Sequence, residues 1–200
     1  MSTDLILAST SVTRQKILSS AGVPFTAVRP EVNEGPLKEE GRAHGSTPDE
    51  VASALARAKA AAVSALHPGS LVIGADQMLS CDGAWFDKPE DMADARRQLC
   101  RLRGREHHLH TAVVLIYGGR VLWQHVARPE LVMRDFSDAF LDRYLEEEGE
   151  ACLSSVGAYR LEGAGIHLFA SVSGEHSAVL GLPLLPLLEG LRVCGAIADV

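Results

Sequence analysis

The chain has 200 residues, of which 46% are hydrophobic and 22% charged, a balance typical of a globular protein. Its formal net charge of −7 argues against binding nucleic acid or an anionic membrane through a general positive field, although a small basic pocket stays compatible with it. No apolar run reaches the roughly 18 residues that cross a bilayer, and the start Met1-Ser2-Thr3-Asp4 lacks the basic region of a signal peptide. We therefore expect a cytoplasmic protein.

The four cysteines are widely scattered and include no C-x-x-C pair. They stand at Cys81, Cys100, Cys152 and Cys194. Neither a disulfide framework nor a structural zinc site is expected from this spacing, and free thiols are the simpler interpretation.

The first half of the chain predicts alternating strands and helices. Strands are expected over 5–8, 25–28 and 71–75, helices over 11–21 and 48–66, and a loop rich in Gly and Pro over 30–47. The second helix has the clearest start, because Thr47 and Glu50 form a capping box around Pro48. Its apolar positions recur as one stripe made of Val51, Leu55, Ala58, Ala62 and Leu66.

The second half continues the alternation. We expect a helix over 91–103, a hairpin over 107–123 with its turn at Gly118-Gly119, a helix capped by Ser137, a strand over 166–172 and a final helix over 183–193. Nothing resembles a linker between independently folding parts. Residues 1–200 are therefore expected to form a single domain.

Two segments carry side chains suited to phosphate chemistry. The turn Ser9-Thr10-Ser11 lies between a buried strand and a helix start, where free N–H groups and the helix dipole favour a phosphate, and Arg14 could add a charge-assisted bond. A plain capped turn explains the same residues. Asp76 follows the apolar strand 71–75, where α/β proteins place ligands. It could deprotonate a water or hold Mg²⁺ or Mn²⁺, or simply end the strand.

Two lysines and one further acid could complete such a site. Lys59 borders the apolar stripe of its helix, and Lys88 stands in Phe86-Asp87-Lys88-Pro89. With Arg14 they would supply the positive charge that a triphosphate needs, although each could also be a surface lysine with a packed stem. Glu34, in the expected loop, could join Asp76 as a metal ligand.

A histidine-rich segment, His107-His108-x-His110, suggests a metal site at first sight. On a strand, His108 and His110 share one face and His107 takes the other. A metal site needs three or four converging ligands. Because no matching Cys or His cluster accompanies these residues, we do not expect a catalytic transition-metal centre here.

The order of the motifs resembles the Maf family. The motifs are Leu5-Ile6-Leu7-Ala8-Ser9-Thr10-Ser11 with Arg14, Ala56-Arg57-Ala58-Lys59-Ala60, Ile73-Gly74-Ala75-Asp76, Lys88-Pro89, Gly157-Ala158-Tyr159 with Glu162-Gly163, and Val179-Leu180-Gly181-Leu182-Pro183-Leu184. The match spans nearly the whole chain. Each motif is short, but the six in this order are specific.

The resemblance implies an α/β fold with an elongated mixed central sheet flanked by helices, in two lobes with a deep cleft, similar to the inosine-triphosphate pyrophosphatases. It implies hydrolysis of a nucleoside triphosphate to a monophosphate and pyrophosphate with a divalent cation. Carried over by position, Asp76 matches the general base and Glu34 an acid near the metal. The phosphate-binding positions match Ser9, Arg14, Lys59 and Lys88.

Three positions bear on the preferred base. A branch of the family that acts on thymidine and uridine triphosphates has Arg, Thr and Gln where this chain has Thr13, Gln77 and Glu162. The choices here resemble the branch that prefers 7-methyl-GTP, although that branch often has Trp at the position of Thr13. N7-methylated guanine carries a positive charge and N–H donors, so the Glu162 carboxylate could accept from the base and favour the cation.

Other functions stay open at this point. The chain could be a pyrophosphatase for dTTP and UTP or of broad specificity, a nucleotide-binding regulator of cell division (septation) that docks a partner, or a phosphomonoesterase that releases orthophosphate. The expected partner is a small-molecule nucleoside triphosphate, with no nucleic acid and no membrane. A homodimer is expected only because symmetric dimers are common.

Overall fold

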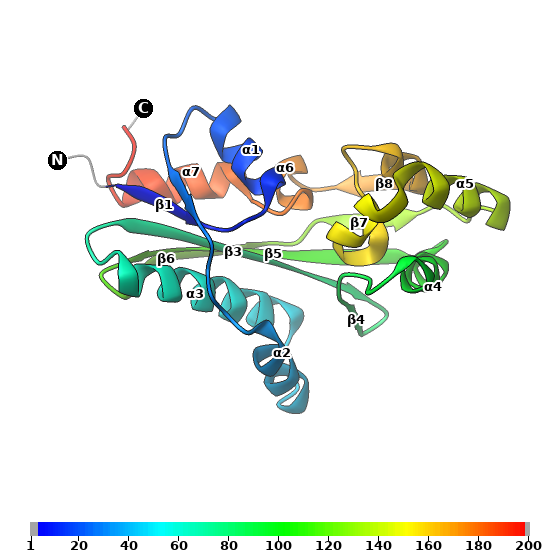
Figure 1. The fold of residues 1–200 in the computed structure, drawn as a ribbon, viewed down its shortest axis with the longest axis horizontal. Helices are drawn as coiled ribbons and strands as arrows, with labels where there is room; N and C mark the ends of the chain where they lie inside the picture. Colours follow the sequence, from blue (N-terminus) through cyan, green and yellow to red (C-terminus); the bar gives the residue numbers. More distant parts are fainter. Residues whose placement is uncertain (1–3, 199–200) are drawn as a thin grey trace. The chain divides into compact units, whose positions relative to one another are not determined.

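The chain forms a mixed α/β fold whose strands pair in the order β2-β1-β3-β5-β7-β8, with β4 beside β3 and β6 beside β5 (Figure 1). The computed structural model describes residues 4–198. These divide into a first unit, with residues up to Gln77, Thr111–Ala127 and from Glu175 onward, and a second unit, with Met78–His110 and Arg128–Gly174. Two strands, β3 (Leu71–Cys81) and β5 (Glu106–Tyr117), pass from one unit into the other. Within residues 4–198, no helix has the length and apolar character to cross a membrane.

The first unit is a sheet covered by helices on both faces. It contains the strands β1 (Leu5–Ala8), β2 (Thr26–Val28) and β6 (Arg120–Ala127), and the helices α1 (Val12–Ser20), α2 (Glu34–Ala43), α3 (Pro48–Leu66), α6 (His176–Val179) and α7 (Leu184–Val193). β1 pairs in parallel with both β2 and β3, and β6 returns antiparallel to β5. The predicted turn of that hairpin at Gly118-Gly119 is confirmed, with positive φ at both residues.

Alternation along the strands gives each face of this sheet its own helices. Leu7, Ile73 and Leu115 belong to the core that also takes in residues of α1 and α7. Side chains one residue along point to the opposite face, which α3 covers (Figure 1). Gly74 lies on that second face, so close to α3 that an added Cβ would meet the Ala56 carbonyl oxygen at 2.1 Å. The absence of a side chain at Gly74 therefore lets α3 pack directly on β3.

The buried face of α3 differs from the predicted stripe. Val51 and Leu55 are buried as expected, but Leu66 is 76% exposed. The face turned inward instead contains small residues and one lysine, namely Ala52, Ala56, Lys59, Ala60 and Val63. Alanine is compatible with either face of a helix, so apolar periodicity alone could not tell which alanines face β3.

The predicted loop over 30–47 is wrong for its central part, which forms α2. Asn33 caps this helix, since its side-chain oxygen accepts a hydrogen bond from Gly35 N at 3.3 Å. Pro36 does not break it, because Pro36 lies in the first turn, where no intrahelical N–H bond is required. Gly41 is buried, and α2 packs against α3. Glu34 is consequently the first residue of a helix and not part of a loop.

Asp76 does not end its strand, as the sequence suggested, because β3 continues to Cys81. The parallel partner β1 stops at Ala8, which pairs with Gly74. Asp76 therefore lies two residues past the last β1–β3 pair. Asp76 thus lies beyond the carboxyl end of the neighbouring strand β1, but it lies within its own strand β3 and not at the end of it.

The second unit combines the remaining strands with helices and short 3₁₀ segments. These are β4 (Ala84–Phe86), β7 (Glu130–Met133), β8 (Phe169–Ser173), α4 (Met92–Leu102), α5 (Asp138–Glu148), η1 (Gly149–Ser154), η2 (Val156–Ala158) and η3 (Ala164–Leu168). The predicted helix over 91–103 and the Ser137 cap of α5 are confirmed. The predicted strand over 166–172 is displaced, because residues up to Leu168 form η3. All four cysteines are free thiols.

Two of the clustered histidines, His107 and His110, are buried in the second unit. The His107 ring packs against Tyr159 and Phe169, and its Nε2 lies 3.0 Å from the Tyr159 hydroxyl. Burial lowers the pKa of His107 to about 4, so the ring is neutral near pH 7. His110 Nε2 lies 2.8 Å from the Ser80 hydroxyl. His108 has the different surroundings described below.

Replacing Gly74 by alanine is expected to force α3 away from β3. The new methyl group overlaps the α3 backbone, so the free energy of unfolding should fall by about 2–3 kcal/mol, measured by urea unfolding. Gly69→Ala is the matched control, because an added Cβ there meets no atom within 4 Å. Its effect should stay within about 0.5 kcal/mol. Equal losses in the two variants would contradict the close contact between α3 and β3.

Candidate active site

One lysine joins two acids in the first unit. The Lys59 ammonium donates to Asp76 Oδ1 and lies 2.7 Å from Glu34 Oε1. Lys59 is 9% exposed and Asp76 only 6%, whereas Glu34 is partly exposed. A buried charge is costly unless it is paired. These three side chains therefore depend on one another, and they form what we call the Lys59 cluster.

The Lys59 cluster is assembled by the contact between α3 and β3. Asp76 follows Gly74 by two residues, so the two share the face of β3 that α3 covers. Lys59 follows Ala56 by three residues and lies on the same face of α3. Close packing at Gly74 thus brings the lysine to the aspartate. The third member, Glu34, comes from the first turn of α2, where the helix dipole favours a carboxylate.

Arg14 lies in the electrostatic field of both acids. Its Nε donates a hydrogen bond to the Gly181 carbonyl oxygen at 2.8 Å. Burial lowers the pKa of the Arg14 guanidinium, and the carboxylates of Asp76 and Glu34 act in the opposite direction. An arginine keeps its charge under such conditions. The cluster and Arg14 together contain two acidic and two basic side chains.

The hydroxyls of the turn before α1 first satisfy the backbone of that turn. Ser11 Oγ accepts from Arg14 N at 3.3 Å, which confirms Ser11 as the N-cap. Ser9 is buried, and its Oγ accepts from Ser11 N at 3.2 Å. Thr13 is the second residue of α1 and is partly buried. The turn is thereby held in one conformation, with the start of α1 at the carboxyl end of β1.

Gln77 points to the other face of β3 from Asp76. Its Nε2 lies within hydrogen-bond distance of Thr111 Oγ1 at 2.8 Å, Ala178 O at 3.0 Å and Val179 O at 3.1 Å. These contacts connect β3 to β5 and to α6. The α6 acceptor Ala178 lies three residues before Gly181, whose carbonyl oxygen accepts from Arg14. The amide nitrogen of Gln77 is thus used inside the protein. A role for Gln77 in base selection stays a prediction.

Two predicted site residues belong to the second unit. Lys88 is exposed in the segment after β4, and Glu162 is exposed in the turn before η3. The Glu148 carboxylate supports that turn, since it accepts from Ala164 N at 2.8 Å and lies 3.3 Å from Arg160 Nη1. The approach of Lys88 and Glu162 to the Lys59 cluster stays a prediction.

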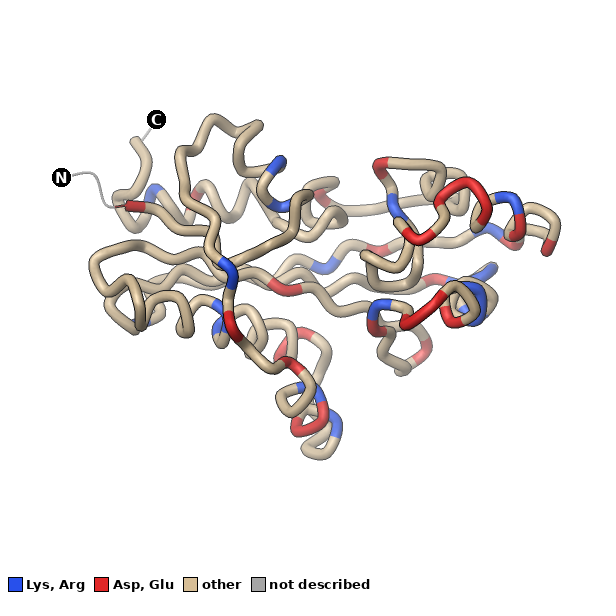
Figure 2. The backbone as a smooth tube through the Cα atoms, viewed as in Figure 1, with Lys and Arg blue, Asp and Glu red and all other residues tan. Residues whose placement is uncertain are grey.

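The structure adds groups that the sequence analysis did not identify. The Gly181 carbonyl and the Ala178 carbonyl each accept a hydrogen bond from a long-range partner, Arg14 and Thr111 respectively. A main-chain carbonyl cannot be identified as an acceptor from the residue type. The burial of Lys59, in contrast, could be suspected from the sequence, because its position borders the apolar face of α3. Figure 2 shows acidic and basic positions interspersed along α2, the helix that Glu34 begins.

Comparisons with known proteins identify the family of this chain. The family model described as Maf-like protein matches residues 4–194. A nucleoside triphosphate pyrophosphatase of Granulibacter bethesdensis is 52% identical over 188 residues, which cover 94% of this chain and 95% of the relative. One of the same name from Paramagnetospirillum magneticum is 50% identical over 190 residues, covering 95% and 98%. A 7-methyl-GTP pyrophosphatase of Rhizobium etli is 47% identical over 197 residues, covering 98% and 99%. A family match over almost the entire length, with relatives this similar, means that the chain belongs to the Maf family.

Proposed function

We infer that this protein is a nucleoside triphosphate pyrophosphatase, a hydrolase that cuts the α–β phosphoanhydride bond to give a nucleoside monophosphate and pyrophosphate. Relatives with that name match 94% and 95% of the chain. The observation that carries the inference is the buried Asp76 carboxylate, which pairs with Lys59 and acts electrostatically on Arg14. A protein that only binds nucleotides has no need of an acid in that position.

The charges of the site support a divalent cation. Glu34 and Asp76 balance Lys59 and Arg14, so these four side chains offer no excess positive charge to a triphosphate. The two carboxylates already converge on one cation, the Lys59 ammonium, and hard ions such as Mg²⁺ and Mn²⁺ prefer carboxylate oxygens. The donor set therefore fits such an ion, with Glu34 and Asp76 as its protein ligands. When bound, the ion would supply positive charge to the phosphate oxygens.

The proposed roles follow from the chemistry of the side chains. Asp76 accepts a proton from a water molecule whose oxygen attacks the α-phosphorus in line with the leaving group. A bond from phosphorus to the water oxygen forms, the bond to the bridging oxygen breaks, and pyrophosphate leaves with the bonding electrons. Ser9 and Arg14 hold the phosphates, while Lys59 and Lys88 stabilise charge on the leaving group.

Lys59 has to change partners for this scheme to work. Asp76 Oδ1 accepts a hydrogen bond from the Lys59 ammonium, so that oxygen is already engaged and not free to receive a proton from water. The phosphates of a bound substrate offer the ammonium an alternative partner. The flexible stem of lysine permits the exchange. Substrate binding would then release Asp76 as a base only when phosphates are present.

The substrate that we propose is a modified nucleotide such as 7-methyl-GTP. A relative 47% identical over 197 residues is named for that activity, whereas nearer relatives have the general name. Glu162 is the residue proposed to contact the base, with Thr13 and Gln77 as further specificity positions. The alternative within the same class is a pyrophosphatase of dTTP and UTP or of broad specificity.

We propose the cytoplasm as the compartment and a symmetric dimer as the assembly. The support for the compartment is the four free thiols, which suit a reducing environment. The support for the assembly is the frequency of symmetric dimers. Size-exclusion chromatography with light scattering would measure the assembly.

Asp76→Asn should abolish most of the activity. The amide cannot accept the proton, so turnover should fall by about a thousandfold or more. Pyrophosphate release with Mg²⁺ or Mn²⁺ measures it, on a panel of 7-methyl-GTP, GTP, dTTP, UTP and CTP. Asp135→Asn, which alters an exposed acid of the second unit, is the control and should keep full activity. Turnover by Asp76→Asn within tenfold of the natural protein would refute the role of Asp76, and release of orthophosphate would indicate a phosphomonoesterase.

Glu162→Gln should change base preference more than turnover. The neutral amide attracts a cationic base less well, so kcat/KM for 7-methyl-GTP relative to GTP should fall by about tenfold. Competition between the two nucleotides in one reaction measures the ratio. Exposed Glu146→Gln should leave it unchanged. If the ratio also stays the same in Glu162→Gln, this residue does not select the base.

Lys59→Met should make stability dependent on divalent cations. Loss of the ammonium leaves two acids facing each other, at a cost of about 3–5 kcal/mol in the free energy of unfolding. Mg²⁺ or Mn²⁺ should restore part of this loss, so the cation should raise the Tm of Lys59→Met more than that of the natural protein. Lys16→Met, which removes an exposed lysine of α1, should show neither effect. An identical Tm response in all three proteins would argue against Glu34 and Asp76 as metal ligands.

A further inference from the structure

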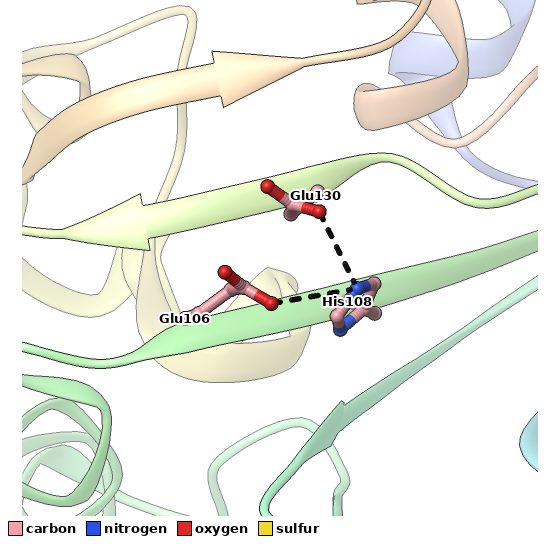
Figure 3. A group of neighbouring side chains, drawn as sticks. All are labelled: Glu106, His108 and Glu130. Carbon is pink, nitrogen blue, oxygen red and sulfur yellow. Dashed lines mark ion pairs between the residues drawn. The ribbon is translucent and has the colours of Figure 1, made fainter.

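A second group of possible metal ligands lies in the second unit, on the paired strands β5 and β7. Figure 3 shows the side chains of Glu106, His108 and Glu130 turned toward one another. His108 Nε2 lies 3.9 Å from Glu106 Oε1 and 3.8 Å from Glu130 Oε2. One ligand atom from each residue lies within 4.8 Å of the other two. None of the three residues has a role in the proposed pyrophosphatase reaction.

Strand pairing holds this group together. Glu106 and His108 are two residues apart on β5, so they share a face. Glu130 pairs directly with His108 across the β5–β7 ladder. All three side chains are about half exposed, at 56%, 41% and 48% for Glu106, His108 and Glu130. The site is therefore built on regular backbone and stays accessible from solvent.

The distances suit a shared ion better than direct hydrogen bonds. An imidazole that donated to a carboxylate would lie about 2.7–3.2 Å from it, and both separations are longer than this. Because one ligand atom of each residue lies within 4.8 Å of the other two, an ion placed between them could reach bonding distance after small movements of these side chains.

We propose that Glu106, His108 and Glu130 bind a transition-metal ion of the zinc type. Imidazole nitrogen and carboxylate oxygen are both ligand types that Zn²⁺ accepts, and a water molecule can take the fourth position. A histidine ligand distinguishes this site from the all-oxygen pair Glu34 and Asp76, which suits Mg²⁺. The charge of the ion would also balance the two carboxylates.

The position of the site in the chain indicates what the ion would do. The chain leaves the second unit after His110 and returns to it at Arg128. Glu106 and His108 come shortly before the departure and Glu130 shortly after the return. A bound ion would link the residues on either side of the segment Thr111–Ala127 and stabilise the pairing of β5 with β7. The ion is therefore assigned a structural role, independent of the proposed catalysis.

Isothermal titration of the full, chelator-treated protein with Zn²⁺ tests the proposal. One equivalent should bind, and His108→Gln should weaken binding by at least about tenfold, because the amide is a far poorer ligand than imidazole. His167→Gln removes an exposed histidine of the same unit that lies outside the group, and it should bind like the natural protein. Absence of Zn²⁺ binding, or equal affinity in His108→Gln, would overturn the site.

Two further measurements separate this site from the proposed active site. Glu130→Gln should also lose affinity, and Zn²⁺ should raise the Tm of the natural protein but not of His108→Gln, because a ligand stabilises only the state that binds it. Asp76→Asn should keep the Zn²⁺ affinity, and excess Mg²⁺ should not compete. Loss of binding in Asp76→Asn, or displacement by Mg²⁺, would assign the ion to the active site and refute the proposal. No enzymatic activity enters these readouts, so their outcome does not depend on the proposed function.

Discussion

The buried ammonium of Lys59 is the constraint on which the first unit depends. An isolated charge in that position would be intolerable, so Lys59 requires Asp76 and Glu34 beside it. This requirement connects β3, α3 and α2, because each supplies one member of the cluster. The ion pair that offsets the cost of burying Lys59 also places the Asp76 carboxylate next to a cation. An acid beside a cation is the arrangement that the proposed phosphoryl chemistry requires. Stability and proposed catalysis thus rest on one set of ion pairs.

A second chain of contacts positions Arg14 from the opposite face of β3. Gln77 and Thr111 both bond to the Ala178 carbonyl, and the segment that follows presents the Gly181 carbonyl to Arg14. Neighbouring residues of one strand therefore serve both sides of the sheet. Asp76 faces the Lys59 cluster, and Gln77 supports the backbone that orients the arginine. Through this division, a short strand segment positions both the proposed base, Asp76, and the proposed phosphate ligand, Arg14.

Much of the architecture could be predicted from local signals. The capping box of Thr47 and Glu50, the Ser11 and Ser137 caps and the turn at Gly118-Gly119 all appear where their chemistry indicated. Such features depend on residues a few positions apart, so they are visible in a single sequence. Family resemblance then supplied the roles proposed for Asp76 and Lys59, which no single motif could suggest.

The sequence by itself determined the starts of α1, α3 and α5, the hairpin, the family and the residue types available for chemistry. Only the tertiary structure decided that α2 is a helix, that β3 continues past Asp76, and that Lys59 pairs with both Glu34 and Asp76. It alone placed Glu130 opposite His108. The physical reason is that these outcomes depend on which surfaces meet. Alanines and a glycine let α3 lie against β3, and strand register pairs residues far apart in the chain, so neither outcome is encoded in the spacing of any one segment.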